Sequence, residues 1–261
     1  MAAKAAKKTQ RAGSTKAKYV VMKAPALRGK KASGEAKPTP AARAKAKKVI
    51  DLLQKRHPDA HIYLDYKTPF QLLISTILAA QCTDERVNEV SPVLFARYPK
   101  PMDLADADPH EVEALVRPTG FFRQKTQSIM ECARVIATEH GGKVPDSLDA
   151  LTSIRGVGRK TANVVLANAF GQQAIAVDTH VQRVSLRIGL ATVKDPVKIE
   201  QQLCALLPEK RWTRATLVLS THGRRICTAY RPDCPHCPVS ALCDYYANAV
   251  QKKSKGRVAG S

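Results

Sequence analysis

The sequence predicts an all-α protein. Apolar residues recur at helical spacing in one segment after another, with capping residues or prolines before many segments and glycines after several. No segment shows the alternation of apolar and polar residues that marks a half-buried strand, and no internal repeat of solenoid length is present. The 261 residues suffice for one large or two modest domains with a hydrophobic core.

Each expected helix has a local reason to begin or to end where it does. Thr and Asp side chains can cap the first free N–H groups, proline fits the first helical turn, and glycine or an X–Pro pair ends a helix. In the first half of the chain, helices are expected from Pro40 to about His57, from Pro69 to Gln81, from Asp84 onward, from Pro109 to the residue before Pro118 and from Phe122 to His140. The inward-facing residues are Val87, Val90 and Leu94 in the third of these helices and Ile129, Cys132, Ala133 and Ile136 in the fifth. In the second half, helices are expected from Leu148 toward the glycines at 156 and 158, from Lys160 to Phe170, from Asp178 to Ile188, from Lys194 to Leu207 and from Trp212 to His222.

Positive charge is concentrated at the N-terminus. The formal net charge is +21, and residues 1–48 hold fifteen Lys and Arg against the single acid Glu35, which leaves +7 for the other 213 residues. A segment rich in Ala, Lys and Pro cannot bury enough apolar surface to fold by itself, so residues 1–40 are expected to form a basic disordered tail. Its expected partner is a polyanion, because each lysine near a phosphate adds salt-sensitive affinity. An organelle transit peptide is the alternative, although lysine prevails over arginine and serine is sparse.

The sequence gives no indication of a membrane segment. The longest apolar run, residues 69–80, is interrupted by polar side chains and is shorter than the roughly 18 residues that a membrane span needs. The chain begins without an apolar signal sequence. We therefore expect a cytoplasmic, nucleoid-associated bacterial protein without a membrane partner.

Residues 151–162, Leu-Thr-Ser-Ile-Arg-Gly-Val-Gly-Arg-Lys-Thr-Ala, place two glycines between two helical patterns. Glycines at i and i+2 there predict a tight hairpin whose backbone can approach a ligand closely. The first turn of the following helix presents free N–H groups, which suit a phosphate. Lys160 lies in that turn, where the helix dipole disfavours a cation by roughly 0.3–1 kcal/mol, and an amine that has lost its proton is a nucleophile. A solvated lysine after an ordinary turn is the alternative.

Four of the seven cysteines form a cluster in the sequence. They follow the pattern Cys-x6-Cys-x2-Cys-x5-Cys, and four thiolates at such spacing can close around one metal centre. The odd cysteine count and this crowding argue against a secreted disulfide framework. Spacing alone does not distinguish zinc from an iron–sulfur cluster, since both accept four cysteines. The cluster comprises Cys227, Cys234, Cys237 and Cys243, and the other cysteines are Cys82, Cys132 and Cys204.

Three further motifs occur with this cysteine run. They are Gly-Val-Gly-Arg-Lys-Thr-Ala-Asn-Val-Val at 156–165, Ala-Val-Asp-Thr-His at 176–180 and His-Gly-Arg at 222–224. In this combination and order the chain closely resembles the bacterial endonuclease III family of the helix-hairpin-helix DNA glycosylase superfamily. The resemblance covers residues 41–245 and leaves out the basic tail.

The resemblance implies two helical domains that flank a DNA-binding cleft. A six-helix barrel would comprise residues 62–172. A discontinuous second domain would combine residues 41–61 and 173–245 and carry a [4Fe–4S] cluster on Cys227, Cys234, Cys237 and Cys243, with zinc as the alternative. Residues 246–261 would form a C-terminal tail. The implied partner of this monomeric protein is double-stranded DNA that contains damaged bases or abasic sites.

The implied activity is that of a bifunctional DNA glycosylase and AP lyase that removes oxidised pyrimidines. Lys160 would be the nucleophile, and Asp178 its carboxylate partner. An amine that displaces the base at C1′ stays attached as an imine, which permits β-elimination of the 3′ phosphate. The carboxylate can help to deprotonate the amine and can stabilise positive charge on the sugar. Plain N-capping of a helix is the other role open to Asp178, and the two roles are compatible.

The same resemblance implies a set of DNA-contacting residues. Gln81 would enter the duplex, and Phe121 would stand at a second wedge position where many bacterial relatives carry leucine. Either Phe121 or Phe122 would be the wedge, and the other would pack in the core. Ile154–Arg155 stands where relatives commonly have Leu-Pro, so the approach to the hairpin is less rigid and more basic. The implied contacts in the hairpin are Arg155, Gly156, Val157, Gly158, Arg159 and Thr161.

Two other functions remain possible from the sequence. An adenine or mismatch glycosylase of the same superfamily also carries four cysteines but lacks the nucleophilic lysine. The adenine type places a catalytic acid in the helix that is expected to end at Gln81, and no acid occurs between Asp65 and Asp84. A non-catalytic DNA-binding module would use Lys160 only as a phosphate contact.

Overall fold

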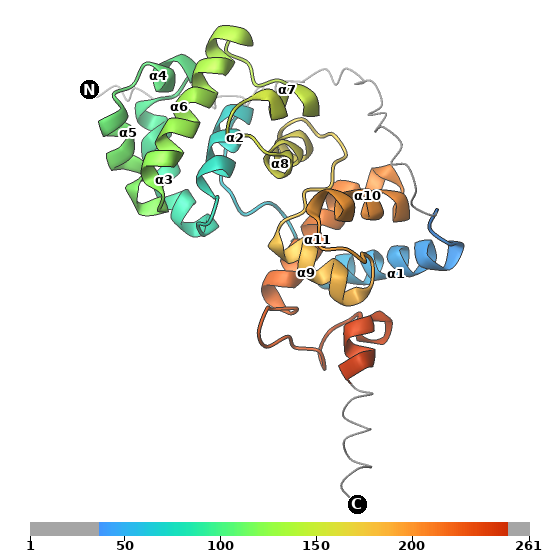
Figure 1. Cartoon of the computed structure of the whole chain (residues 1–261). Helices are drawn as coiled ribbons and strands as arrows, with labels where there is room; N and C mark the ends of the chain where they lie inside the picture. Colours follow the sequence, from blue (N-terminus) through green and yellow to red (C-terminus); the bar gives the residue numbers. More distant parts are fainter. Residues whose placement is uncertain (1–36, 250–261) are drawn as a thin grey trace, which may run out of the picture. The chain divides into compact units, whose positions relative to one another are not determined.

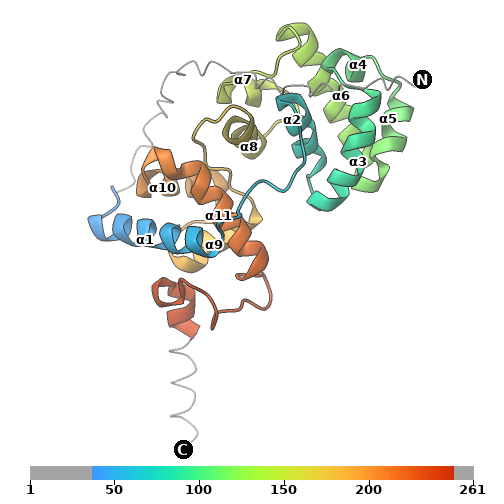
Figure 2. The same cartoon turned by 180° about the vertical axis from the view of Figure 1, so that it is seen from behind.

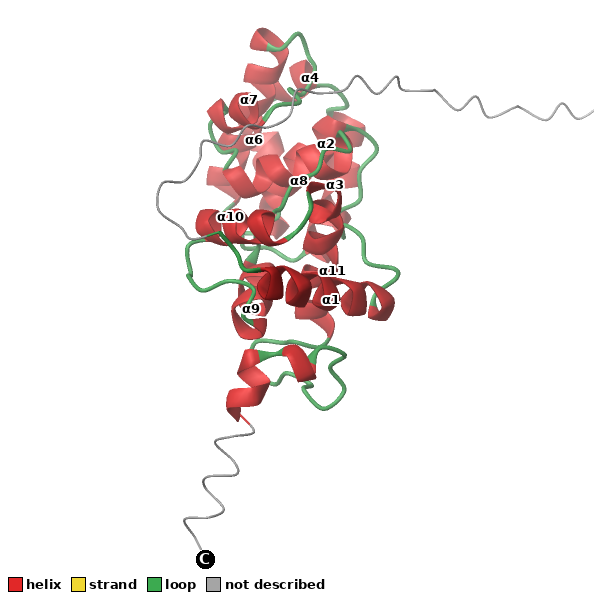
Figure 3. Ribbon diagram, turned by 90° about the vertical axis from the view of Figure 1, so that its right-hand side faces the viewer, coloured by secondary structure: helices red, strands yellow, loops and turns green. Residues whose placement is uncertain are grey.

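The computed structural model of the protein describes residues 37–249. The expected basic tail therefore lies outside the described residues except for its last four positions, and most of the expected C-terminal tail lies outside them as well. Within residues 37–249 the chain contains helices, turns and loops but no strand, which confirms the predicted all-α class (Figure 3). None of the helices in this part of the chain is long and apolar enough to cross a membrane.

Eleven labelled α-helices follow one another within residues 37–249, the longest connection between two of them is residues 57–68, and residues 244–249 are helical as well. The labelled helices are α1 (Pro40–Arg56), α2 (Pro69–Leu78), α3 (Asp84–Arg97), α4 (Pro101–Ala105), α5 (Pro109–Val116), α6 (Phe122–Glu139), α7 (Leu148–Ser153), α8 (Arg159–Ala169), α9 (Thr179–Ile188), α10 (Pro196–Leu206) and α11 (Trp212–Arg225), with 3₁₀ turns at Arg117–Thr119, Glu209–Arg211 and Ser240–Leu242.

Side-chain caps fix most helix starts at the predicted positions. Thr39 accepts a hydrogen bond from the N–H of Ala42, and Thr83 accepts one from the N–H of Arg86. The same arrangement recurs at the expected starts of α5, α7 and α9. Each such bond satisfies one of the free N–H groups of the first turn and stabilises the helix by about 1 kcal/mol.

Three predicted helix boundaries differ from the structure by two or three residues, and one helix was not predicted. The helix expected to reach Gln81 ends at Leu78, because the chain turns there and Gln81 has left-handed backbone with φ +54°. α4 was not expected, since five residues are too few to show a helical period. α10 begins at Pro196 behind an Asp195 cap, and α11 continues to Arg225.

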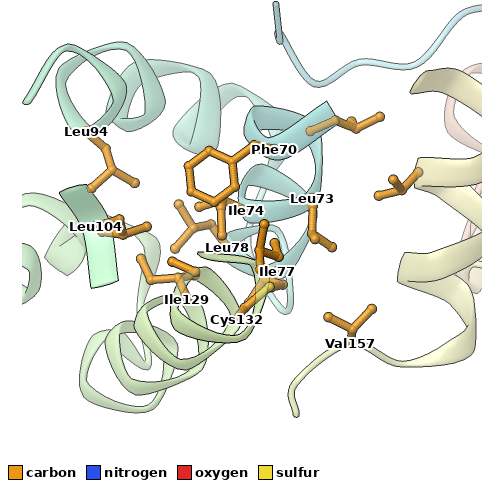
Figure 4. Packing of buried hydrophobic residues seen from close by; sticks show 14 of the residues in the cluster. Phe70, Leu73, Ile74, Ile77, Leu78, Leu94, Leu104, Ile129, Cys132 and Val157 are labelled. Carbon is orange, nitrogen blue, oxygen red and sulfur yellow. The ribbon is translucent and has the colours of Figure 1, made fainter. Parts of the chain in front are cut away.

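One hydrophobic cluster is built around α2. Eight of its ten residues are buried, so this helix has no solvent-facing side over most of its length. Figure 4 shows Phe70, Leu73, Ile74, Ile77 and Leu78 of α2 between side chains of α3, α4 and α6 on one side and Val157 on the other. The cluster comprises buried residues between positions 64 and 166.

A second hydrophobic cluster joins α1 to α9, α10 and α11. Its buried residues lie between positions 46 and 60 and between 175 and 239, so the first helix of the described chain packs against the last ones (Figures 1 and 2). α9 and α11 approach closely at Gly223, where an added Cβ would lie 2.7 Å from the Cβ of His180. The residue limits of two separate domains stay a prediction.

Candidate functional site

The hairpin between α7 and α8 is held against the rest of the first cluster. Gly156 has φ +87°, and a Cβ added there would lie 3.2 Å from the Cβ of Ser128 on α6, so glycine permits both the turn and the close approach. Val157 is buried, which means that only its backbone faces outward. Gly158 is extended, with φ −81°, and precedes α8 as its N-cap. Of the two predicted glycines, only Gly156 needs positive φ.

The start of α8 differs from most other helix starts, because Gly158 has no side chain that could accept a hydrogen bond. The first-turn N–H groups of α8 therefore keep the capacity to bind an external anion. Arg155 and Thr161 stand on either side of this start, exposed and half-buried respectively. This geometry suits a phosphate of a nucleic acid backbone.

Arg159 is tied to another helix. Its guanidinium donates two hydrogen bonds of 2.8 Å to the carboxylate of Glu200 on α10, and this pairing raises the pKa of Arg159. Its side chain is therefore engaged within the protein, and only the backbone of Arg159 is available in the hairpin.

Lys160 and Asp178 line one cleft. The cleft is open to solvent and is lined by residues 61–64 and by side chains of α8 and α11. Lys160 is the second residue of α8 and is exposed, so its amine is accessible. The fold thus brings two residues that are eighteen positions apart to one cavity.

Asp178 occupies its place through both carboxylate oxygens. Oδ1 accepts a 2.7 Å hydrogen bond from the N–H of Val181 and caps α9, and Oδ2 accepts a 2.8 Å hydrogen bond from the hydroxyl of Ser220 on α11. The capping role is therefore present. Each oxygen keeps a lone pair, so the cap leaves the carboxylate able to accept a proton or face a positive charge in the cleft.

Gln81 and Phe121 line a second depression, together with Gly156 and Thr161. Phe121 is 62% exposed, whereas Phe122 packs against the first cluster with the guanidinium of Arg117 4.9 Å from its ring centre. Of the two phenylalanines, Phe121 is thus the one whose side chain is open to solvent. The depression joins the hairpin to both residues that were expected to enter a duplex.

Comparisons with known proteins match this arrangement. A family model described as HhH-GPD superfamily base excision DNA repair protein matches residues 74–209. Endonuclease III of Synechocystis sp. is 48% identical to the chain over 200 residues, which are 76% of this chain and 91% of that protein. The chain belongs to the endonuclease III family of the HhH-GPD superfamily. The resemblance inferred from the motifs is thereby confirmed.

More distant relatives and solved structures extend the match. Endonuclease III of Escherichia coli is 34% identical over 78% of this chain and 96% of that protein. A trapped endonuclease III–DNA covalent intermediate superposes with a TM-score of 0.77 at 38% identity and covers 80% of this chain and 98% of that one. A thermostable thymine-DNA glycosylase gives a TM-score of 0.73 at 25% identity, with 80% and 99% coverage.

The sequence did not predict an ion pair that lies at the cleft. Arg224 on α11 lies 2.7 Å from the carboxylate of Asp84, the first residue of α3, and its guanidinium stands 4.9 Å from the ring centre of Tyr63. All three residues line the cleft with Lys160. The pair joins residues 140 positions apart, so no local pattern indicates it, although the His-Gly-Arg motif contains Arg224.

All four clustered cysteines line one cavity at the C-terminal ends of α9 and α11. None forms a disulfide, and burial raises the pKa of the Cys234 and Cys237 thiols, which makes their thiolates costly without a bound cation. Arg187 organises the segment through hydrogen bonds to the carbonyls of Thr228 and Ala229, 2.7 and 2.8 Å long. Four thiols that line one cavity are the type of donor set found both in [4Fe–4S] clusters and in zinc sites. In residues 37–249 no three potential ligands stand at the spacing of a single metal ion.

Proposed function

We propose that this protein is a DNA glycosylase and AP lyase of base excision repair that removes oxidised pyrimidines from double-stranded DNA. One observation carries the proposal: Lys160 and Asp178 line the same cleft, and Lys160 directly follows a hairpin whose backbone suits a phosphate. The family, whose model is described as base excision DNA repair protein, supports the same activity. A trapped covalent DNA complex among the similar structures supports a covalent mechanism.

In the proposed reaction the neutral amine of Lys160 attacks C1′ of the damaged nucleotide. The N–C1′ bond forms, the bond from C1′ to the base breaks, and the base leaves with the electron pair of that bond. Loss of the amine protons and opening of the sugar ring give an imine between lysine and C1′. Removal of a C2′ proton then expels the 3′ phosphate by β-elimination and nicks the strand.

Asp178 has two roles in this reaction. Its carboxylate can accept a proton from the attacking amine and can stabilise the positive charge that develops on the sugar. The hydrogen bonds from Val181 and Ser220 hold the carboxylate in place before substrate arrives, so little reorganisation accompanies the reaction.

The damaged nucleotide must leave the base stack before C1′ becomes accessible. We assign this step to Gln81 and Phe121, which line the same depression beside the hairpin. The backbone of residues 155–161 would hold phosphates of the DNA strand that carries the damaged nucleotide. Val157 and Arg159 would contribute through their backbone, because their side chains are engaged elsewhere.

The remaining parts of the proposal concern organisation and partners. The two hydrophobic clusters support a domain of residues 62–172 and a discontinuous domain of residues 41–61 and 173–245. Cys227, Cys234, Cys237 and Cys243 would hold a [4Fe–4S] cluster, which supplies a cross-link that orders the segment after α11. The protein would act as a monomer on the nucleoid, with its basic tail adding non-specific affinity for DNA.

Borohydride trapping tests the chemistry. Reduction of an imine joins enzyme and DNA covalently, so the wild-type protein should form a stable adduct with duplex DNA that contains an abasic site. Lys160→Ala should bind the same DNA and form no adduct, and a Lys143→Ala control in an exposed turn should behave like the wild type. Trapping that survives in Lys160→Ala would place the nucleophile elsewhere. Base removal without any trapping would favour a glycosylase that uses water.

A further inference from the structure

Lys125 is a buried cation beside the expected wedge. Its side chain comes from the first turns of α6, its relative exposure is 5%, and it lines the depression with Gln81 and Phe121. Among the described residues no carboxylate lies within ion-pair distance of its ammonium group. Burial lowers the pKa of Lys125. Burial of an ammonium group without a carboxylate partner destabilises the fold, so stability does not explain why a lysine stands at this position.

The contacts of Lys125 surround the loop that carries Phe121. Its Nζ donates a 2.7 Å hydrogen bond to the carbonyl of Thr119, and its backbone N–H donates a 3.0 Å hydrogen bond to the carbonyl of Phe121. One residue therefore binds the chain on both sides of the peptide bond between Gly120 and Phe121. Thr119 is itself buried, and its hydroxyl donates a 2.8 Å hydrogen bond to the carbonyl of Val116.

The loop needs such support because its backbone is unusual. Phe121 has φ +48° and ψ 32°, a left-handed conformation that bulky residues seldom adopt, and Gly120 before it has φ +70°. A strained conformation persists only where the surroundings over-determine it. The exposed ring of Phe121 makes few contacts of its own that could hold it, since 62% of the residue is open to solvent.

We propose that Lys125 is a positioning residue that fixes Phe121 in its duplex-entering conformation through the hydrogen bond from its ammonium group to Thr119. The inference rests on the proposed glycosylase function and adds a residue to it. Lys125 acts through Phe121, so its removal should matter only where a base has to be displaced.

The test compares Lys125→Met with the wild type. Methionine fills the volume of the lysine stem but has no donor for Thr119. The expected result is a fall in kcat/KM on duplex DNA with a paired oxidised pyrimidine of about 10- to 100-fold, the range for a misplaced positioning group. A fluorescent 2-aminopurine beside the lesion should also report less unstacking on binding. Lys143→Met removes a charge from an exposed turn and should leave both measurements unchanged.

Further variants make the test decisive. In a Phe121→Ala background Lys125→Met should cause no additional loss, because its target is gone. Lys125→Arg, which keeps a charged donor, should restore most of the unstacking signal. If Lys125→Met does not fold, Lys125→Leu, which also has no donor for Thr119, takes its place with the same expected loss. Equal losses with and without Phe121, or a wild-type unstacking signal in the folded neutral variant, would overturn the proposal. The unstacking signal does not require catalysis, so an inactive wild-type protein would refute the proposed function without deciding this inference.

Discussion

Gln81 and Phe121 share a backbone conformation and a location. Across residues 37–249 they are the only residues other than glycine with positive φ, at +54° and +48°, and both line the depression beside the hairpin. A left-handed residue with a side chain costs roughly 1–2 kcal/mol, so the fold keeps two strained positions where both side chains face the expected path of DNA. Strain of this kind accumulates at functional sites.

This relationship predicts that stability and activity separate at Gln81. Gln81→Gly removes the side chain and relieves the strain, whereas Gln81→Ala removes the side chain and keeps the strain. Both variants should lose activity on paired lesions, and the glycine variant should be more stable than the alanine variant by about 1 kcal/mol in urea unfolding. Normal base removal by Gln81→Gly would exclude Gln81 from base displacement.

Asp178 offers a similar separation between a cap and a catalytic carboxylate. Asparagine caps helices about as well as aspartate, so Asp178→Asn should change the free energy of unfolding only slightly, while Asp178→Ala should lower it by about 0.5–2 kcal/mol. Both variants lack the negative charge and should lose base removal and borohydride trapping to a similar degree. A fully active Asp178→Asn would show that Asp178 serves only as the cap of α9.

The helix starts show what could be predicted from the sequence. Thr39, Thr83 and Asp178 begin helices through bonds to residues three positions away, and such local chemistry is visible in the sequence. Clear helical periods likewise placed the buried face of α6. The family motifs then pointed to Lys160 and Asp178, whose shared cleft appears only in the fold.

Long-range pairs and backbone turns were not predictable. Asp84 and Arg224 meet only because α3 and α11 approach each other at the cleft, and nothing near either residue indicates the other. α2 was expected to reach Gln81 because the sequence there contains neither glycine nor proline. The left-handed turn at Gln81 is imposed by its surroundings, and local propensity does not report it.

His180 predicts a loss of stability in mild acid. Burial lowers its pKa from the usual 6.5, nearby Arg183 and Arg224 act in the same direction, and Asp178 and the backbone at Gly223 oppose it. Because the folded state binds this proton less readily than the unfolded state, the stabilising contribution is complete above about pH 6.5 and is lost as pH falls through the lowered pKa. Urea unfolding of His180→Gln should show a weaker decline between pH 7 and 5 than the wild type. Parallel curves would assign the decline to other groups.

The cysteine cavity predicts a bound iron–sulfur cluster that is needed for the segment after α11. The purified protein should absorb broadly in the violet-blue and contain iron and sulfide in equal amounts. Cys237→Ala should lose this absorption and expose residues 227–243 to proteolysis, whereas Cys132→Ala, at a buried position on α6, should keep the absorption. A colourless protein that contains zinc would instead assign the four thiols to a zinc site.

Arg159 gives a prediction about salt dependence. Its guanidinium is bound to Glu200, so Arg159→Ala should leave the slope of DNA affinity against salt concentration nearly unchanged. Glu200→Gln removes the charge of its partner and frees the guanidinium beside the hairpin, so that it can neutralise one phosphate and steepen the slope by about 0.9. Binding titrations between low and moderate salt measure both slopes. A clearly shallower slope in Arg159→Ala would mean that DNA competes with Glu200 for this side chain, because a protein with one fewer phosphate-binding cation releases fewer counterions from the DNA.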